Sequence, residues 1–149
     1  MNLTIRAAEP GDKAGWLPLW RGYLEFYDSS VPDTVTDSVW AQISGDDEAL
    51  HGLVAVDGDG GIVGMINYVL HANTWTLTPM CYLEDLFVSP PLRGHGIGLA
   101  LIEHLQSVGK RENWRRIYWM THKDNAQARL LYDKVATESD FLRYDLPLD

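Results

Sequence analysis

The sequence predicts an α/β (α+β) domain built on one mixed, curved sheet with flanking helices. Strand-like and helix-like segments alternate in the second half of the chain, the 149 residues are enough for one sizeable core, and no repeat, low-complexity run or linker divides them. Hydrophobic residues make up 46% of the chain, including six Trp and seven Tyr, which favours a folded globule over disorder. We therefore expect a single domain over residues 1–149.

The first half of the chain predicts an opening strand, two helices and a hairpin. Leu3 and Ile5 alternate with polar residues, as in a half-buried strand. Asp12 is the expected N-cap of a helix whose apolar positions run from Trp16 to Tyr27, with Pro18 near its first turn, where proline is best tolerated. The expected elements are a strand over 2–7, this helix, a helix over 35–43, and strands over 53–56 and 62–70 joined by an Asp- and Gly-rich turn.

The second half predicts two strand–helix pairs and a closing strand. An apolar strand over 81–88 is stopped by Pro90 and Pro91, because proline lacks the N–H that continues a strand ladder. A helix follows from about Ile97, with an apolar stripe of Ile97, Leu101, Leu105 and Val108. The remaining expected elements are a buried strand over 116–121, a helix over 125–134 and a final strand over 141–146.

The charge of the chain is acidic and unevenly distributed. Residues 1–79 hold 11 Asp and Glu against 3 Lys and Arg, so they account for −8 of the net charge of −9. A negative field repels nucleic acid and attracts cations, although it can equally be a solubilising surface. We expect no nucleic-acid partner.

The single cysteine excludes an internal disulfide framework and a cysteine metal cluster, and we expect no metal. Cys81 is expected to be a small buried hydrophobe, with a covalent acyl-cysteine as the alternative. No apolar run reaches the roughly 18 residues of a membrane span, and the N-terminus lacks the apolar core of a signal peptide. These features predict a cytoplasmic protein without a membrane partner.

A glycine-rich turn joins the strand over 81–88 to the helix that follows. Gly94, Gly96 and Gly98 remove side chains from alternate positions, so backbone N–H groups can approach a ligand closely. The helix N-terminus adds unpaired N–H groups and the positive end of its dipole, which favour an anion, above all a phosphate. The spacing fits neither the dinucleotide pattern Gly-x-Gly-x-x-Gly nor a Walker loop, which requires Gly-Lys-Ser/Thr. The stretch therefore predicts a phosphate cradle of another kind, with an ordinary turn as the alternative.

A second motif lies on the helix over 125–134. Asn125, Ala128 and Tyr132 are spaced i, i+3 and i+7, which places them on one face of a helix. Together with Arg93-x-x-Gly96-x-Gly98, the segment Asn125-Ala-Gln-Ala-Arg-Leu-Leu-Tyr132 resembles the cofactor motifs of the GNAT N-acetyltransferase superfamily. The order of the expected elements also resembles the GNAT fold, in which the central strands of a strongly curved sheet splay apart and bind acetyl-CoA.

The resemblance implies an acetyl-CoA site and part of the chemistry. In the family the glycine turn binds the pyrophosphate, the asparagine holds the CoA arm, and the tyrosine reaches the thioester sulfur, where it can protonate the leaving thiolate. Backbone N–H groups of the splayed strand can stabilise the oxyanion. Tyr132 is therefore an expected catalytic residue. The expected cofactor-binding residues are Leu86, Phe87, Val88, Arg93, Gly94, His95, Gly96, Ile97, Gly98, Leu99, Asn125 and Ala128.

Acetyl transfer to an amine also requires a base, because an ammonium group of pKa ~10 has no lone pair. Glu84 is the expected base. Strand alternation places it on one face with Leu86, and Asp85 on the other with Leu83 and Phe87. Two adjacent carboxylates in an apolar strand are costly to bury unpaired, so at least one should have a function.

The run Tyr82-Leu-Glu-Asp-Leu-Phe-Val88 resembles polyamine acetyltransferases, in which the glutamate of this strand is assigned as a water-mediated base. Pairing of Glu84 with an arginine is the alternative, and His71 and His122 are rival bases. This run indicates the histone and polyamine acetyltransferase branch of the family.

The branch implies a small cationic or amino-acid-like acceptor, such as a polyamine or a lysine side chain. The alternatives are a catalytically silent CoA-binding sensor or interaction module, and acetylation of a protein or of a D-amino acid amine. A homodimer is expected. The family's usual Gly-Phe/Tyr pair is replaced after Val135 by Ala136-Thr-Glu-Ser-Asp140, which leaves the last strands open. The expected substrate-binding residues are Tyr27, Asp28, His71, Trp75 and Asp85.

Overall fold

The computed structural model describes residues 2–47 and 49–148, and the chain divides into two compact units. The first unit, Met1–Trp119, contains the sheet and three α-helices. The second unit, Met120–Asp149, contains one α-helix and an extended tail. The described helices are all too short or too polar to span a bilayer.

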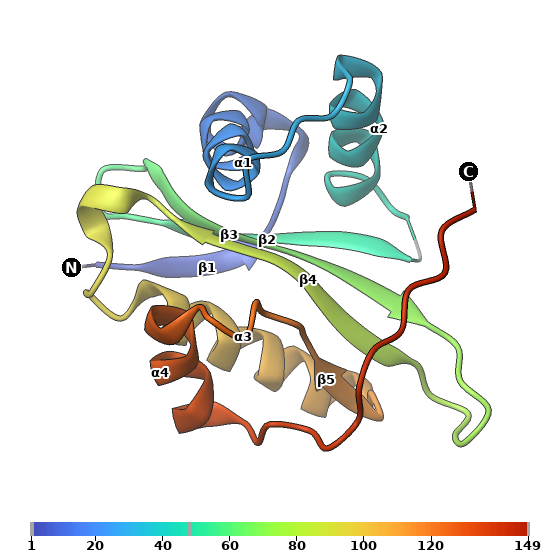
Figure 1. Cartoon of the computed structure of the whole chain (residues 1–149). Coiled ribbons are helices and arrows are strands. Elements are labelled where there is room, and N and C mark those ends of the chain that lie inside the picture. Colours follow the sequence, from blue (N-terminus) through green and yellow to red (C-terminus); the bar gives the residue numbers. More distant parts are fainter. Residues whose placement is uncertain (1, 48, 149) are drawn as a thin grey trace. The chain divides into compact units, whose positions relative to one another are not determined.

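The sheet of the first unit is mixed, as the sequence predicts (Figure 1). Its strand order follows the chain, and each strand is antiparallel to the next except for the last pair, which is parallel. The strands are β1 (Thr4–Ala7), β2 (Leu50–Val56), β3 (Ile62–His71), β4 (Met80–Val88) and β5 (Arg116–Tyr118).

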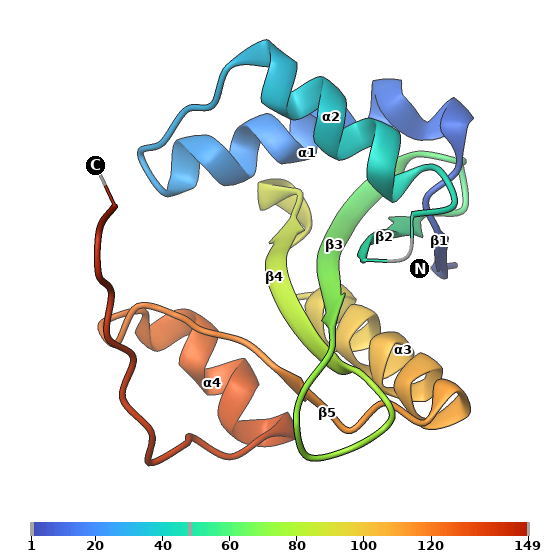
Figure 2. The same ribbon diagram turned by 90° about the vertical axis from the view of Figure 1, so that its right-hand side faces the viewer.

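Helices cover both faces of this sheet (Figure 2). Helices α1 (Lys13–Phe26) and α2 (Asp33–Ile43) bury a core with Trp16 at its centre, which also includes Met65 of β3 and Phe87 of β4. Helix α3 (Ile97–Glu112) covers the other face, where Ile97, Leu101 and Leu105 of the expected stripe are buried and Val108 is half-buried. A Cβ atom at Gly64 of β3 would lie only 3.0 Å from the side chain of Ile97, so glycine lets the helix approach the sheet closely.

The start of α1 differs from the prediction. Asp12 occupies the N-cap position, but its carboxylate makes no cap hydrogen bond to the helix. Arg6 donates to it at 2.7 and 2.9 Å, and the Glu9 N–H donates at 2.8 Å. The turn Pro10–Asp12 is a 3-10 turn, so Asp12 ties this turn to β1. Pro18 lies inside α1.

The last two expected strands are shorter or missing. β5 ends at Tyr118 instead of residue 121 and is only partly buried. The predicted strand over 141–146 is wrong, because residues 141–148 form no strand and the Phe141 side chain is 91% exposed. Within the second unit, the Arg143 side chain of this tail donates to the Asp145 carboxylate at 2.8 Å. An alternating pattern makes a strand only when another strand supplies hydrogen-bond partners.

Candidate active site

The glycine turn has the geometry of an anion site. A short 3-10 turn, Pro90–Leu92, follows β4, and Gly94 and Gly96 both adopt φ of 82°, which glycine reaches without strain. α3 then begins at Ile97, and a Cβ atom at Gly94 or Gly96 would meet nothing within 4 Å. The first N–H groups of a helix have no partner within it, and here Ala100 is the first to bond back, to Gly96 O. These unpaired donors in open space fit the diphosphate of acetyl-CoA.

The side chain of Arg93 packs against rings rather than standing free. Its guanidinium lies 4.9 Å from the centre of the Phe87 ring and 5.8 Å from that of Phe26, and its Nε donates to Val88 O at 3.2 Å. The ring Nδ1 of His95 lies 3.0 Å from Leu92 O, which fixes the turn further. The backbone of this turn is therefore the part best suited to a phosphate.

The second half of β4 lacks a strand partner on one side. β5 pairs with Met80–Tyr82 only, whereas β3 pairs along nearly the whole of β4. In the described part of the sheet, the β5-facing edge of Leu86–Val88 is thus left without a ladder. This is the splay that the family resemblance implies. The Phe87 side chain is 7% exposed and belongs to the core, so this residue can serve a cofactor through its backbone only.

A β-bulge at Glu84 corrects the predicted alternation of β4. Asn67 pairs with Asp85 and the next residue of β3, Tyr68, pairs with Leu83, so Glu84 is an extra residue. Leu83 and Asp85 therefore point to opposite faces instead of sharing one. Asp85 lies on the same face as its cross-strand partner Asn67. Alternation along β3 places Asn67 with Met65, on the face that α1 covers. Bulges often lie next to active sites, where they redirect side chains.

The bulge brings two carboxylates together near α1. Asp85 is 8% exposed, and burial raises its pKa, while hydrogen bonds from Tyr23 and from the Asn67 carboxamide act in the opposite direction. The Asn67 bond is 3.0 Å long. Glu84 is exposed, yet partial desolvation raises its pKa and the charge of Asp85 raises it further. Among the described residues no Lys or Arg forms an ion pair with Glu84, so the expected alternative, an arginine partner, is not seen.

Two residues that were not among the predicted site residues act on these carboxylates, Tyr23 and Asn67. Burial and the charge of Asp85 raise the pKa of Tyr23, and the same two causes raise that of Tyr27. Asn67 is 1% exposed in a strand whose neighbouring side chains are apolar. A lone amide within an apolar run is the signal that could have found it.

The rival bases are both engaged elsewhere. His71 Nδ1 lies 2.9 Å from Ala72 O, and its Nε2 lies 2.8 Å from the hydroxyl of Tyr118. The exposed His122 lies 3.6 Å from the Asp124 carboxylate. Trp75 is 80% exposed in the loop between β3 and β4, with the Arg115 guanidinium 5.9 Å from its ring centre.

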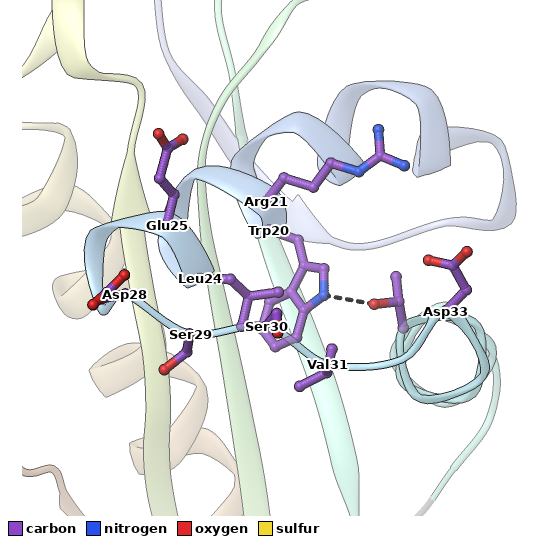
Figure 3. Close-up of a pocket in the computed structure, with 10 residues that line it drawn as sticks. Trp20, Arg21, Leu24, Glu25, Asp28, Ser29, Ser30, Val31 and Asp33 are labelled. Atoms are coloured by element: carbon purple, nitrogen blue, oxygen red, sulfur yellow. Dashed lines mark hydrogen bonds between the residues drawn. The ribbon is translucent and has the colours of Figure 1, made fainter.

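Asp28 lies in a different environment from Tyr27. It has a positive φ of 50° and lines an open hollow of about 480 Å³ between α1, α2 and their connecting segment (Figure 3). Trp20 forms part of the wall and donates to Thr36 Oγ1 at 3.0 Å. Tyr23, Glu84 and Asp85 do not line this hollow. Its lining residues are Trp20, Arg21, Leu24, Glu25, Asp28, Ser29, Ser30, Val31, Asp33 and Thr36.

The single cysteine is buried as predicted. Cys81 is 0% exposed, and burial raises the pKa of its thiol to about 12. Because the thiolate is the nucleophile, this environment argues against the covalent acyl-cysteine alternative. In the part of the chain that the structure describes, no group of three His, Cys, Asp or Glu side chains could hold a metal ion.

The second unit holds the other motif on helix α4 (Ala126–Val135). Asn125 caps this helix, since its Oδ1 accepts from the Ala128 N–H at 3.3 Å, and its Nδ2 lies 3.4 Å from Thr121 Oγ1. Tyr132 is partly buried two turns along the helix. The cap gives Asn125 a structural role beside the CoA contact that the resemblance implies.

Comparison with known proteins identifies the family. The model of the Acetyltransferase (GNAT) family matches residues 16–136. The chain is 32% identical over 144 residues to the D-amino-acid N-acetyltransferase HPA3 of Saccharomyces cerevisiae, covering 96% of this chain and 89% of the relative.

Two solved structures have the same fold. The ribosomal-protein-alanine N-acetyltransferase from Brucella melitensis biovar Abortus 2308 superposes with a TM-score of 0.83 at 21% identity, covering 99% of this chain and 100% of the other. AAC(6')-Iy in complex with the bisubstrate analogue CoA-S-monomethyl-acetylneamine gives 0.84 at 19% identity, with 100% of both chains covered. The predicted GNAT fold is thereby confirmed. The chain belongs to the acetyltransferase (GNAT) family and is an acetyl-CoA-dependent N-acetyltransferase.

Proposed function

We propose that the protein transfers an acetyl group to the primary amine of a small cationic or amino-acid-like acceptor, by direct attack in a ternary complex. The observation that carries the proposal is the β4 bulge, which places exposed Glu84 beside buried Asp85 in the strand whose second half has no β5 partner among the described residues. Acetyl-CoA supplies the activated thioester, and the residues of the chain bind the reactants and move protons.

Glu84 is the proposed base. An acceptor ammonium must lose a proton before its nitrogen can attack, and a base works best when its pKa approaches the working pH. Desolvation and the charge of Asp85 both raise the pKa of Glu84, which makes it a stronger base than a free glutamate. N–H groups on the unpaired edge of Leu86–Val88 are the proposed donors to the oxyanion, and Tyr132 is the proposed acid for the thiolate.

Charge and aromatic side chains support a cationic acceptor. Glu84 and Asp85 carry negative charge, and Tyr23 and Tyr27 of α1 lie within their field. Aromatic faces and carboxylates both attract ammonium groups. A polyamine or a lysine side chain is therefore our first candidate. The name of the yeast relative supports a second candidate, a D-amino acid.

A matched panel of amines tests the proposal. We would follow CoA release with acetyl-CoA and spermidine, a lysine peptide, and the D- and L-forms of one amino acid. If spermidine or the lysine peptide has the highest kcat/KM of the panel, the first candidate is supported. If the D-amino acid has the highest kcat/KM and is preferred over its L-form, the second is supported. Glu84→Gln should lower kcat roughly 10²- to 10⁴-fold on the preferred acceptor, the usual range for a lost base. No turnover of any amine, despite CoA binding, would refute the proposal.

We also propose a homodimer. The tail leaves large apolar side chains exposed, and contiguous exposed apolar surface commonly marks an interaction site. The mass of one chain is 16.8 kDa, and light scattering after size exclusion should give twice that mass. A monomer at every concentration would contradict this. The exposed tail residues are Phe141, Leu142, Tyr144, Leu146 and Leu148.

A further inference from the structure

A buried polar network on the α1 face of the sheet is not explained by the acetyl-CoA site. Its centre is Asp85, which accepts a hydrogen bond from the Asn67 carboxamide of β3 at 3.0 Å. Burial and the charge of Asp85 raise the pKa of Tyr23 of α1. A buried carboxylate with no cation beside it is costly, so a network that keeps one needs a reason. Within the described residues, none of the ion pairs involves Asp85.

The hydrogen bond to Asp85 fixes the orientation of the Asn67 amide. An ionised carboxylate only accepts hydrogen bonds, so the Asn67 amide must turn its Nδ2 toward Asp85. This orientation leaves Asn67 Oδ1 buried without a partner among the described residues. An unsatisfied buried acceptor destabilises the fold, and such groups are often found where function requires them.

Tyr23 lies close enough to the same carboxylate for its charge to act on the hydroxyl, and it comes from α1, which packs on this face of the sheet. Its ring stacks on Trp20 with the ring centres 5.8 Å apart, and it lies tilted against the Tyr27 ring with the centres 4.9 Å apart. These contacts hold the hydroxyl toward Asp85 independently of the sheet. The bulge then places Glu84 next to this fixed charge, at the open side of the strand.

We propose that Tyr23 and Asn67 are positioning residues for acetyl transfer, which hold Asp85 beside Glu84 so that the two carboxylates act as one coupled pair. The inference rests on the proposed role of Glu84 as base. In the step concerned, an N–H bond of the acceptor ammonium breaks, its electron pair stays on nitrogen, and the proton passes to Glu84. The neutral amine and the neutral acid replace one positive and one negative charge. Asp85, held ionised, favours this transfer because it makes Glu84 bind the proton more tightly.

Within the described residues of the first unit, the groups that act on the pair come from three elements. Tyr23 and Tyr27 face it from α1 and Asn67 from β3, and Glu84 and Asp85 come from β4 itself. Because the two carboxylates interact, their apparent pKa values belong to the pair. Loss of a donor to Asp85 should raise the pair's higher pKa, whereas loss of the Asp85 charge should lower the pKa of Glu84.

Two variants should therefore move the acid limb of the kcat/KM profile in opposite directions. Tyr23→Phe keeps the stacked ring and removes only the hydroxyl, so the limb should move to higher pH, with kcat/KM below the limb reduced about tenfold. Asp85→Asn should move the limb to lower pH and reduce the plateau rate, because the base becomes weaker. Tyr68→Phe is the matched control. It removes a buried hydroxyl from the same sheet, but its ring packs on Trp114 and His51.

A second measurement does not depend on activity. In the full-length protein labelled with ¹³C, the side-chain carboxyl signals of Glu84 and Asp85 should titrate together. Tyr23→Phe should shift this joint titration to higher pH, and the Glu84 signal that remains in Asp85→Asn should shift to lower pH. Asn67→Ala should resemble Tyr23→Phe. A merely structural role would change the rate and stability but leave the limb and the carboxyl titration of Tyr23→Phe at their wild-type positions, and that result would overturn the inference. If the wild-type protein turns over no amine but the two carboxyl groups still titrate together, the proposed function fails. The coupling of Glu84 and Asp85 is then supported without a role in acetyl transfer.

Discussion

A single methyl group at Gly96 should separate the ligand role of the glycine turn from its role in folding. Gly96 adopts φ of 82°, a conformation that costs an L-residue about 1–2 kcal/mol. A Cβ atom there would meet nothing within 4 Å, so this backbone strain is the only cost to the free protein. For a chain of this size, the strain corresponds to a fall in Tm of roughly 2–8 °C. The added methyl would point into the open space that we assign to the diphosphate of acetyl-CoA.

Gly60 provides a control with nearly the same geometry. It lies in the turn between β2 and β3 at φ of 84°, and a Cβ atom there also meets nothing within 4 Å. Gly60→Ala and Gly96→Ala should therefore lose the same stability by thermal denaturation. In calorimetric titration with acetyl-CoA, only Gly96→Ala should weaken binding, by at least about tenfold, or ~1.4 kcal/mol. Wild-type affinity in Gly96→Ala, or equal losses in both variants, would refute the assignment of the loop.

Three further variants test separate parts of the structure. Tyr132→Phe should lower kcat while leaving the Kd of acetyl-CoA within about twofold, and unchanged turnover would remove the tyrosine from the mechanism. Asp12→Asn tests the bond to Arg6, which holds the pKa of Asp12 below its ordinary value of 3.8. A lowered pKa adds stability above pH 3.8 that is lost as the pH falls through the folded value, so the variant should be less stable by about 1–2 kcal/mol at pH 7 and approach wild type in acid. A difference in unfolding free energy that does not vary with pH would contradict this. Gly64→Ala should cost about 1–3 kcal/mol in denaturant unfolding, because its Cβ would lie 3.0 Å from Ile97, and a neutral effect would show that α3 can shift.

The sequence was sufficient for the parts of the fold whose signal is local. The prolines after β4, the glycines of the turn and the apolar stripe of α3 each act on their own stretch of chain, and the structure has the helix at Ile97 as expected. Those signals also carried the resemblance to the family, so the cofactor motifs could be found before any geometry was known. Whether these motif residues bind acetyl-CoA remains a prediction that the variants above test.

The sequence was insufficient where the outcome depends on a distant partner. The bulge at Glu84 is invisible in β4 alone, because it arises from the register with β3, and one extra residue reverses which neighbours share a face. Asp12 was expected to cap α1, but Arg6 of β1 provides a stronger partner for its carboxylate. The tail over 141–146 alternates like a strand, yet it forms no ladder in the described structure.

The steady-state kinetic mechanism tests the central claim most directly, which is direct transfer of the acetyl group from acetyl-CoA to the amine. Initial rates would be measured while both acetyl-CoA and the best acceptor of the panel are varied. Direct attack in a ternary complex predicts intersecting double-reciprocal lines and no acetylated protein after incubation with acetyl-CoA alone. This agrees with the complete burial of Cys81. Parallel lines together with an acetyl adduct on the protein, detected by mass spectrometry, would contradict the account.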